Sequence, residues 1–151
     1  MQGFISYSHL DADRVEQLRR HLHPVTRVLG INFWIDENIQ AGEAWDRKIK
    51  EALSKAKLFL FCVSSDLLFS NYIDKVELKE ARAKYDRGEA LMVPVILRDC
   101  TWEWVEAFAE LQAVPKRGRA IQLWRPQDTG YADAARRIGT MLKDHLAGAA
   151  P

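Results

Sequence analysis

The sequence predicts a doubly wound α/β domain, in which helices cover both faces of a parallel sheet of about five strands. Short apolar runs alternate along the chain with segments whose apolar residues recur at helical spacing. The run Leu58–Val63 is apolar at every position, as expected for a central strand that is buried on both faces. Strands that alternate with helices join through right-handed crossovers, and this connection produces a parallel sheet.

The individual elements follow from local patterns. Strands are expected at residues 3–7, 31–35, 58–63, 91–97 and 120–123. Helices are expected from Asp11 or Asp13 to Gly30, around residues 45–53, from Ser70 or Asn71 to Arg87, and over a last segment with Ala135, Ile138, Leu142 and Leu146 on one face. Pro24 should end or offset the first helix, and Pro94 should create a bulge or an edge in the fourth strand, because proline has no amide hydrogen to donate.

Length and charge limit the class of protein. A chain of 151 residues fits one domain, expected over residues 1–147, with 148–151 as a tail or the start of a linker. The formal net charge of +1 gives no strong basic footprint for nucleic acid or an anionic membrane. No signal peptide is visible, and no apolar run approaches the roughly 20 residues needed to span a bilayer. We therefore expect a cytoplasmic protein.

The cysteines and histidines give no sign of a metal site. Cys62 and Cys100 lie far apart without CxxC spacing, which favours reduced thiols. The four histidines form no HExxH or similar pattern, so we expect no bound metal.

Ligands of an open α/β sheet bind beyond the carboxyl ends of the strands. The segments expected there are polar but hold no GxGxxG, GxxxxGKS or GxSxG motif, which argues against a Rossmann dehydrogenase, a P-loop NTPase and an α/β-hydrolase. Asp66 ends the third strand where a receiver domain has its phosphoacceptor. Receivers also need an acidic pair and a lysine, where this chain has Ser8-His9 and Leu123-Trp124, so we reject that reading.

Motifs in order along the chain resemble those of TIR (Toll/interleukin-1 receptor) domains. They are FISYSH at residues 4–9, WID through IQAG at residues 34–42, SSD through SNY to a glutamate at residues 64–77, and VPVIL at residues 93–97. Each motif is weak alone, whereas their shared order over residues 2–146 is specific. The resemblance implies a flavodoxin-like fold.

The resemblance also implies an activity. Some TIR domains are non-catalytic scaffolds or adaptors, and others, including bacterial antiphage effectors, hydrolyse NAD⁺ at the bond between nicotinamide and ribose. The catalytic glutamate of the enzymatic branch falls on Glu77. Nicotinamide leaves as a neutral molecule, and a carboxylate can stabilise the oxocarbenium-like ribose, so one carboxylate is chemically plausible. NAD⁺ is then the substrate, and no cofactor is expected.

Other residues of the motifs are candidates for the NAD⁺ pocket. Ser8 and His9 occupy positions where some enzymatic relatives carry arginine. Asp36 binds a ribose hydroxyl or caps its loop, and Trp45 lines the pocket or anchors the second helix in the core. Tyr72 stacks on a ring of NAD⁺ or packs within the protein.

The loop from Asp36 to Gly42 is the expected assembly loop. It is polar apart from Ile39 and Ala41, includes Gln40, and ends in a glycine that permits more than one backbone shape. One alternative is that Ile39 packs onto its own helix. The other is that the loop docks head-to-tail on a second TIR domain, a contact that builds filaments. A fused or separate sensor domain is the further partner that this model of activation implies.

Overall fold

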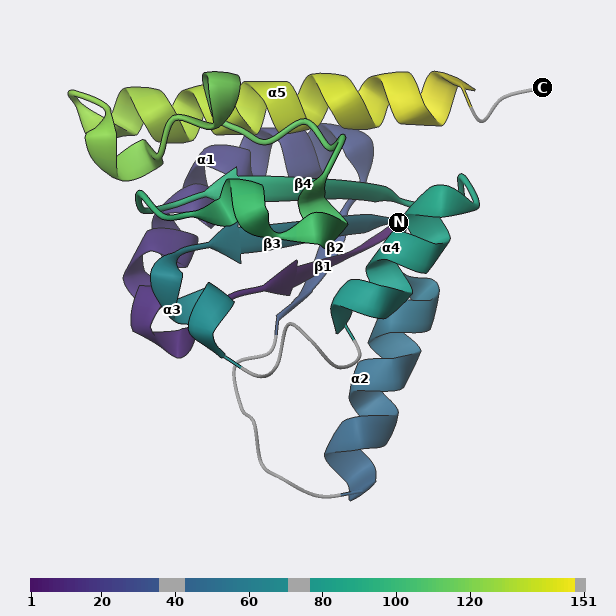
Figure 1. Ribbon diagram of the computed structural model, residues 1–151. Helices are drawn as coiled ribbons and strands as arrows, with labels where there is room; N and C mark the ends of the chain where they lie inside the picture. The colour runs from purple at the N-terminus through teal and green to yellow at the C-terminus, as the bar shows by residue number, and fades with distance from the viewer. Residues whose placement is uncertain (36–42, 71–76, 149–151) are drawn as a thin grey trace.

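The structure, a computed structural model, describes residues 1–35, 43–70 and 77–148, with the backbone alone at residues 43–46. Its sheet contains four parallel strands in the order β2-β1-β3-β4 (Figure 1). The strands are β1 (Gln2–Ser6), β2 (Asn32–Ile35), β3 (Leu58–Val63) and β4 (Leu91–Ile96).

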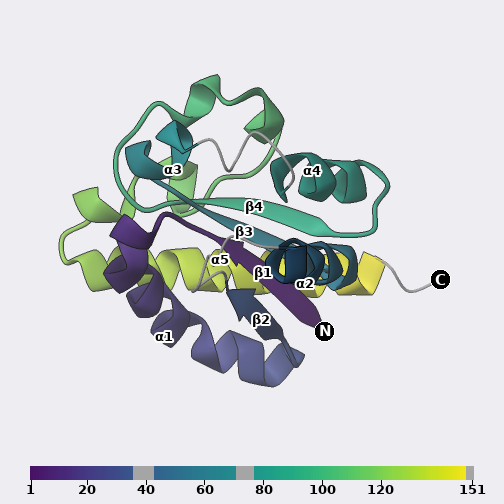
Figure 2. The ribbon, with the colours of Figure 1, turned by 90° about the horizontal axis from the view of Figure 1, so that it is seen from below.

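Helices cover both faces of this sheet. In Figure 2, α1 and α5 lie on one side of the strands, and α4 lies on the other. The helices are α1 (Ala12–Leu29), α2 (Glu43–Lys55), α3 (Ser65–Phe69), α4 (Leu78–Asp86) and α5 (Gln127–Gly148). Short 3₁₀ turns complete the described chain: η1 (His9–Asp11), η3 (Trp102–Trp104), η4 (Glu106–Phe108), η5 (Lys116–Gly118) and η6 (Ile121–Leu123).

The central strand β3 divides the core into two layers. Phe59, Phe61 and Val63 are fully buried against the side of α2 and α4, whereas Leu60 and Cys62 face α1 and α5. Alternate side chains of a strand point to opposite faces, so a strand covered on both faces must be apolar at every position. The doubly wound α/β fold is therefore confirmed.

The expected fifth strand is wrong, because residues 121–123 form the 3₁₀ turn η6. Val114 occupies the place beside β4 instead, through a single parallel bridge to Val95. The Val114 amide donates to the carbonyl of Pro94, and the Ile96 amide donates to the carbonyl of Val114. Pro94 has no amide hydrogen to donate towards this segment, and on the other side of Val114 the Lys116 amide donates to Asp133 Oδ2 at 2.8 Å, so the ladder does not extend. Pro94 thus lies on the outer edge of β4, in regular register with Phe61 and without a bulge.

Two other local expectations also differ from the structure. Helix α1 runs through Pro24 without ending and stops at Gly30, whose left-handed backbone (φ +66°) forms the C-cap. The short helix α3 was not expected. Ser70 follows it with an extended backbone and so does not begin a helix, while Asn71 lies outside the described residues.

No helix among the described residues is both long and apolar enough to cross a membrane.

Candidate active site

The direction in which the chain winds reverses between β1 and β3. The chain leaves β1 to form β2 on one side and then returns to form β3 on the other, so the direction of winding reverses between these strands. This reversal is where open α/β sheets bind ligands, beyond the carboxyl ends. Ser6 pairs in register with Phe61 near this end.

A buried polar pair lies at the end of β1. Ser6 points to the same face as Phe4, towards α4, because alternate residues of a strand share a face. Its Oγ donates a hydrogen bond to Oε2 of Glu77 at 2.7 Å. Glu77 directly precedes α4. Ser6 is only 3% exposed and Glu77 only 2% exposed. Strand β1 and helix α4 thus hold one carboxylate beside the switch point.

A second polar cluster, the Asp11 network, joins the loops that follow β1, β3 and β4. Asp11 accepts a hydrogen bond from Ser64 Oγ at one carboxylate oxygen and from Arg98 Nε at the other, the latter at 2.8 Å. Ser64 also caps α3, because its Oγ accepts from the Leu67 amide at 3.2 Å. Asp11 is 2% exposed and Ser64 is fully buried, whereas the side chain of Arg98 is 26% exposed.

Arg98 extends the Asp11 network to Asp66. The guanidinium donates to both carboxylates, and these hydrogen bonds, first with Asp11 and then with Asp66, raise the pKa of Arg98. A planar guanidinium is well suited to two carboxylates at once. Asp66, the residue that suggested a phosphoacceptor, is therefore part of an ion-pair network.

Helix α4 is anchored at its other end by a buried lysine. Lys84 Nζ donates to the carbonyls of Leu53, Ser54 and Ala56 at 3.1, 2.8 and 2.5 Å, where α2 ends. Desolvation lowers the pKa of Lys84. A cation near a helix C-terminus also interacts favourably with the carbonyl dipoles. The helix that follows Glu77 is thus tied to α2.

The structure brings together only part of the predicted site. Ser8 accepts from the Leu10 amide at 3.3 Å at the start of η1, and His9 is exposed in the same turn. Glu77 lies at the switch point, as described above. Five candidates lie outside the described residues (Asp36, Ile39, Gln40, Gly42 and Tyr72), and so does the side chain of Trp45.

Sequence reasoning missed Ser6 and Asp11. Ser6 stands inside the FISYSH motif, and strand alternation alone puts its side chain on the face of Phe4. A polar side chain at the buried end of a strand needs a hydrogen-bond partner, and this requirement is the signal by which Ser6 could be found from the sequence. Asp11 was considered only as a helix cap.

Two further observations concern possible metal ligands and the thiols. Among the described residues, no group of histidine, cysteine, aspartate and glutamate residues is arranged to hold a metal ion. Burial raises the pKa of both Cys62 and Cys100, which lowers the fraction of reactive thiolate.

Fold and site together define a doubly wound α/β domain that holds a buried carboxylate where such sheets bind ligands. The family model of the TIR domain matches residues 4–138, which is most of the chain. The chain belongs to the TIR domain family.

The chain is also similar to a longer protein. A protein of Sinorhizobium fredii, described as "Uncharacterized protein y4lF", is 34% identical to the chain over 135 residues. The match covers 89% of this chain and 42% of the relative, so the chain spans about two fifths of the relative's length.

Proposed function

We propose that this TIR domain is an NAD⁺ hydrolase that cleaves the bond between nicotinamide and ribose, with Glu77 as the catalytic carboxylate. The observation that carries the proposal is the Ser6–Glu77 hydrogen bond of 2.7 Å, which fixes a carboxylate at the switch point of the sheet. A carboxylate fixed before the reaction can stabilise positive charge on the ribose without reorganising during it. Nicotinamide leaves as a neutral molecule, so no acid has to protonate it.

The burial of Glu77 supports activation by assembly. Glu77 is only 2% exposed, so the ribose of NAD⁺ reaches its carboxylate only after the site opens. Our proposal is that self-association through the loop of Asp36, Ile39, Gln40 and Gly42 drives this opening. A fused or separate sensor domain would start assembly during phage infection, in the bacterial cytoplasm.

The remaining pocket residues belong to the same proposal. Ser8 and His9 follow β1 and are assigned to the NAD⁺ pocket together with Asp36, Trp45 and Tyr72. We assign the domain to residues 1–147 and treat residues 148–151 as a tail or the start of a linker.

The test is NAD⁺ turnover by clustered protein, with Glu77→Gln as the variant. This nearly isosteric change removes the negative charge and keeps the shape, so turnover should fall on the order of 10²–10³-fold. Glu80→Gln, one helical turn further on, is the matched control and should keep the activity of the parent. Circular dichroism should show that both variants are folded.

Equal turnover by the parent and Glu77→Gln would contradict the catalytic assignment. Absence of turnover in the parent, even when it is clustered, would favour the alternative of a non-catalytic scaffold. Loss in Glu80→Gln alone would move the site by one helical turn.

A mixing experiment tests whether two copies share the site. Glu77→Ala protein keeps its assembly loop, and Gly42→Pro protein keeps its carboxylate. Each should be inactive alone, and the mixture should recover part of the parent's turnover. No recovery at concentrations where the parent is active would count against a shared site.

A further inference from the structure

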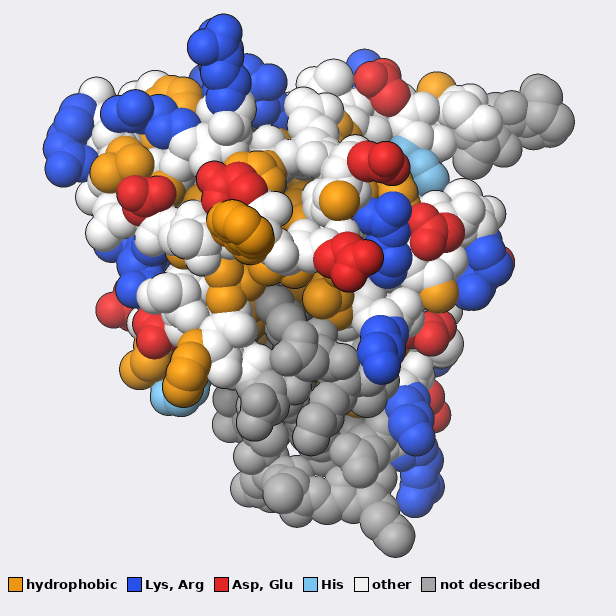
Figure 3. Space-filling model, viewed as in Figure 1, with side chains coloured by type: hydrophobic (Ala, Val, Ile, Leu, Met, Phe, Trp, Pro, Cys, Tyr) orange, Lys and Arg blue, Asp and Glu red, His pale blue; other side chains and the backbone are white. Residues whose placement is uncertain are grey.

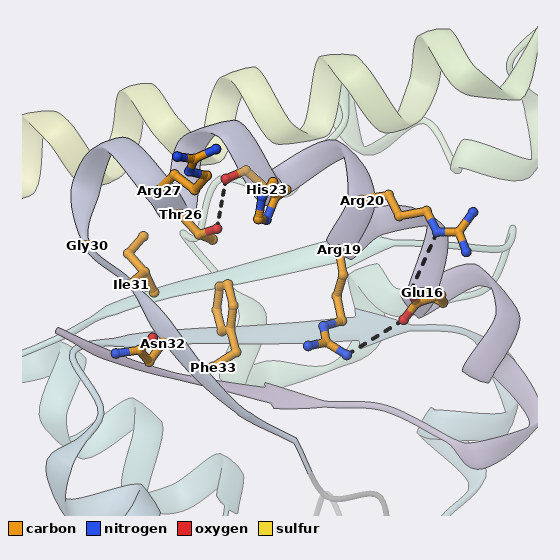
Figure 4. A pocket seen from close by; sticks show the side chains of 10 residues that line it. All are labelled: Glu16, Arg19, Arg20, His23, Thr26, Arg27, Gly30, Ile31, Asn32 and Phe33. Carbon is orange, nitrogen blue, oxygen red and sulfur yellow. Dashed lines mark hydrogen bonds and ion pairs between the residues drawn. The ribbon is translucent and has the colours of Figure 1, made fainter.

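A groove with basic walls runs between α1 and the outer strand β2. It has a volume of about 790 Å³, and its wall on α1 carries Arg19, Arg20, His23 and Arg27 (Figure 4). Glu16 is the acidic residue of the lining and pairs with two of these arginines, Arg19 at 3.6 Å and Arg20 at 3.5 Å. One carboxylate against three guanidiniums leaves the groove with an excess of positive charge.

The segment that follows β4 has the opposite charge. Residues 99–112 contain Asp99, Glu103, Glu106 and Glu110 and no lysine or arginine. All four carboxylates are on exposed residues, and Trp104 between them is 88% exposed. Acidic and apolar side chains gather over this part of the face in Figure 3. We call residues 99–110 the acidic loop.

Arg82, one of the cations near the acidic loop, does not neutralise the loop carboxylates. Arg82 on α4 donates to the carbonyls of Ala107 and Ala109, at 3.1 Å each, and pairs with Asp86 at 3.1 Å. Its guanidinium is thus engaged with α4 and the backbone rather than with the loop carboxylates. Lys79 of the same helix lines a hollow together with Glu106, so the excess negative charge of the loop rests mainly on its other carboxylates.

The two surfaces lie on opposite sides of the molecule. Strands β2 and β4 are the two ends of the four-stranded order, so the groove and the acidic loop belong to opposite edges. Figure 2 shows α1 below the sheet and the segment after β4 above it. One copy therefore cannot bring its own acidic loop to its own groove.

We propose that the arginine groove of one copy binds the acidic loop of a second copy, in a head-to-tail contact. The Glu103 and Glu106 carboxylates face the guanidiniums of Arg20 and Arg27, and the exposed Trp104 ring stacks on an arginine. Arginine over the face of tryptophan is a favourable cation–π arrangement. The contact joins unlike surfaces, so each added copy leaves one groove and one loop available, and the chain of copies stays open.

Charge favours the acidic loop of a second copy, rather than its arginine groove, as the partner of the arginine groove. Two copies that joined through their β2 edges would bring two sets of arginines together, and like charges across an interface are unfavourable. The acidic loop supplies both the opposite charge and an apolar ring. This interface uses neither the loop of residues 36–42 nor Glu77, so it stands independently of the proposed enzymatic activity.

The experiment is sedimentation of the complete chain as its concentration rises, at low and high salt. The parent should self-associate, and added salt should weaken the association because it screens exposed charges. The groove variant Arg20→Glu/Arg27→Glu and the loop variant Glu103→Arg/Glu106→Arg should each associate on the order of 100-fold more weakly than the parent. Mixing them should restore association, since each keeps one parental surface and their altered surfaces are again of opposite charge.

A matched control changes charge elsewhere. Arg136→Glu/Lys143→Glu alters two exposed residues of α5 and should associate like the parent. A parent that stays monomeric at low salt would overturn the proposal, even if a free acidic peptide bound the groove. Parent-like association of the groove variant would overturn it as well.

Discussion

Asp11 and Glu77 are equally buried carboxylates near the same edge of the sheet, and they differ in what they contact. Each is 2% exposed. Asp11 is bonded to the guanidinium of Arg98 and to Ser64, whereas the bond described for Glu77 comes from the neutral hydroxyl of Ser6. Burial alone therefore does not separate a structural carboxylate from a catalytic candidate. Asp11 is the structural carboxylate of the two, because removing one partner from a buried ion pair is strongly destabilising.

The largest effect on stability should come from Asp11→Asn. The change leaves Arg98 with one carboxylate instead of two and breaks an ion pair in which Asp11 is buried and Arg98 is 26% exposed. Loss of one partner from a fully buried pair typically costs about 3–5 kcal/mol in the free energy of unfolding, and the partial exposure of Arg98 places the expected loss at the lower end of this range. Urea denaturation of the variant and the parent would measure it.

Glu77→Gln is the matched control, because it neutralises an equally buried carboxylate. It should change stability by about 1 kcal/mol or less, since the glutamine carbonyl can still accept the hydrogen bond from Ser6 Oγ. A loss as large as that of Asp11→Asn would show that Glu77 too is a structural carboxylate.

A smaller effect is expected for Arg98→Lys. Lysine keeps the charge but lacks the planar fork that reaches Asp11 and Asp66 together. The free energy of unfolding should fall by about 1.5 kcal/mol, the low end of the usual range for one hydrogen bond to a charged group. Thermal denaturation gives the measurement. A variant as stable as the parent would mean that charge, and not geometry, is what Arg98 supplies.

The smallest effect is expected for Ser6→Ala, which removes the hydroxyl that positions Glu77. Stability should fall by about 1 kcal/mol, the usual net contribution of one hydrogen bond. If Glu77 is catalytic, NAD⁺ turnover should fall about fivefold, which corresponds to the same free energy. Ser6→Cys keeps a weak donor and should lie between the two. A turnover loss in Ser6→Ala as large as that of Glu77→Gln would mean that the hydroxyl does more than position the carboxylate.

Local patterns were enough to predict the layers of the fold. The unbroken apolar run of β3 and the helical spacing in α1 and α5 depend only on neighbours along the chain. The prediction of a fifth strand failed because such a strand depends on the hydrogen-bonding groups that β4 presents at its outer edge. There Pro94 donates no hydrogen bond, and the neighbour turned out to be Val114.

The sites were harder to predict because their contacts span long separations. Ser6 and Glu77 are 71 residues apart, and Asp11 is 53 residues from Ser64 and 87 from Arg98. No periodicity reports such pairs. Glu77 was found through its place in the resemblance to TIR domains, and the Asp11 network was not found, since its members look like ordinary caps and surface charges.

The lysine that ties α4 to α2 also sets how the candidate site can move. Lys84 follows Glu77 by seven residues, which is about 10 Å along a helix. Its ammonium donates hydrogen bonds to the carbonyls at the end of α2. These hydrogen bonds therefore hold the two helices together near Lys84. If α4 tilts and so moves Glu77, we expect it to pivot near Lys84. We expect α2, the helix that follows the proposed assembly loop, to pivot near the same residue.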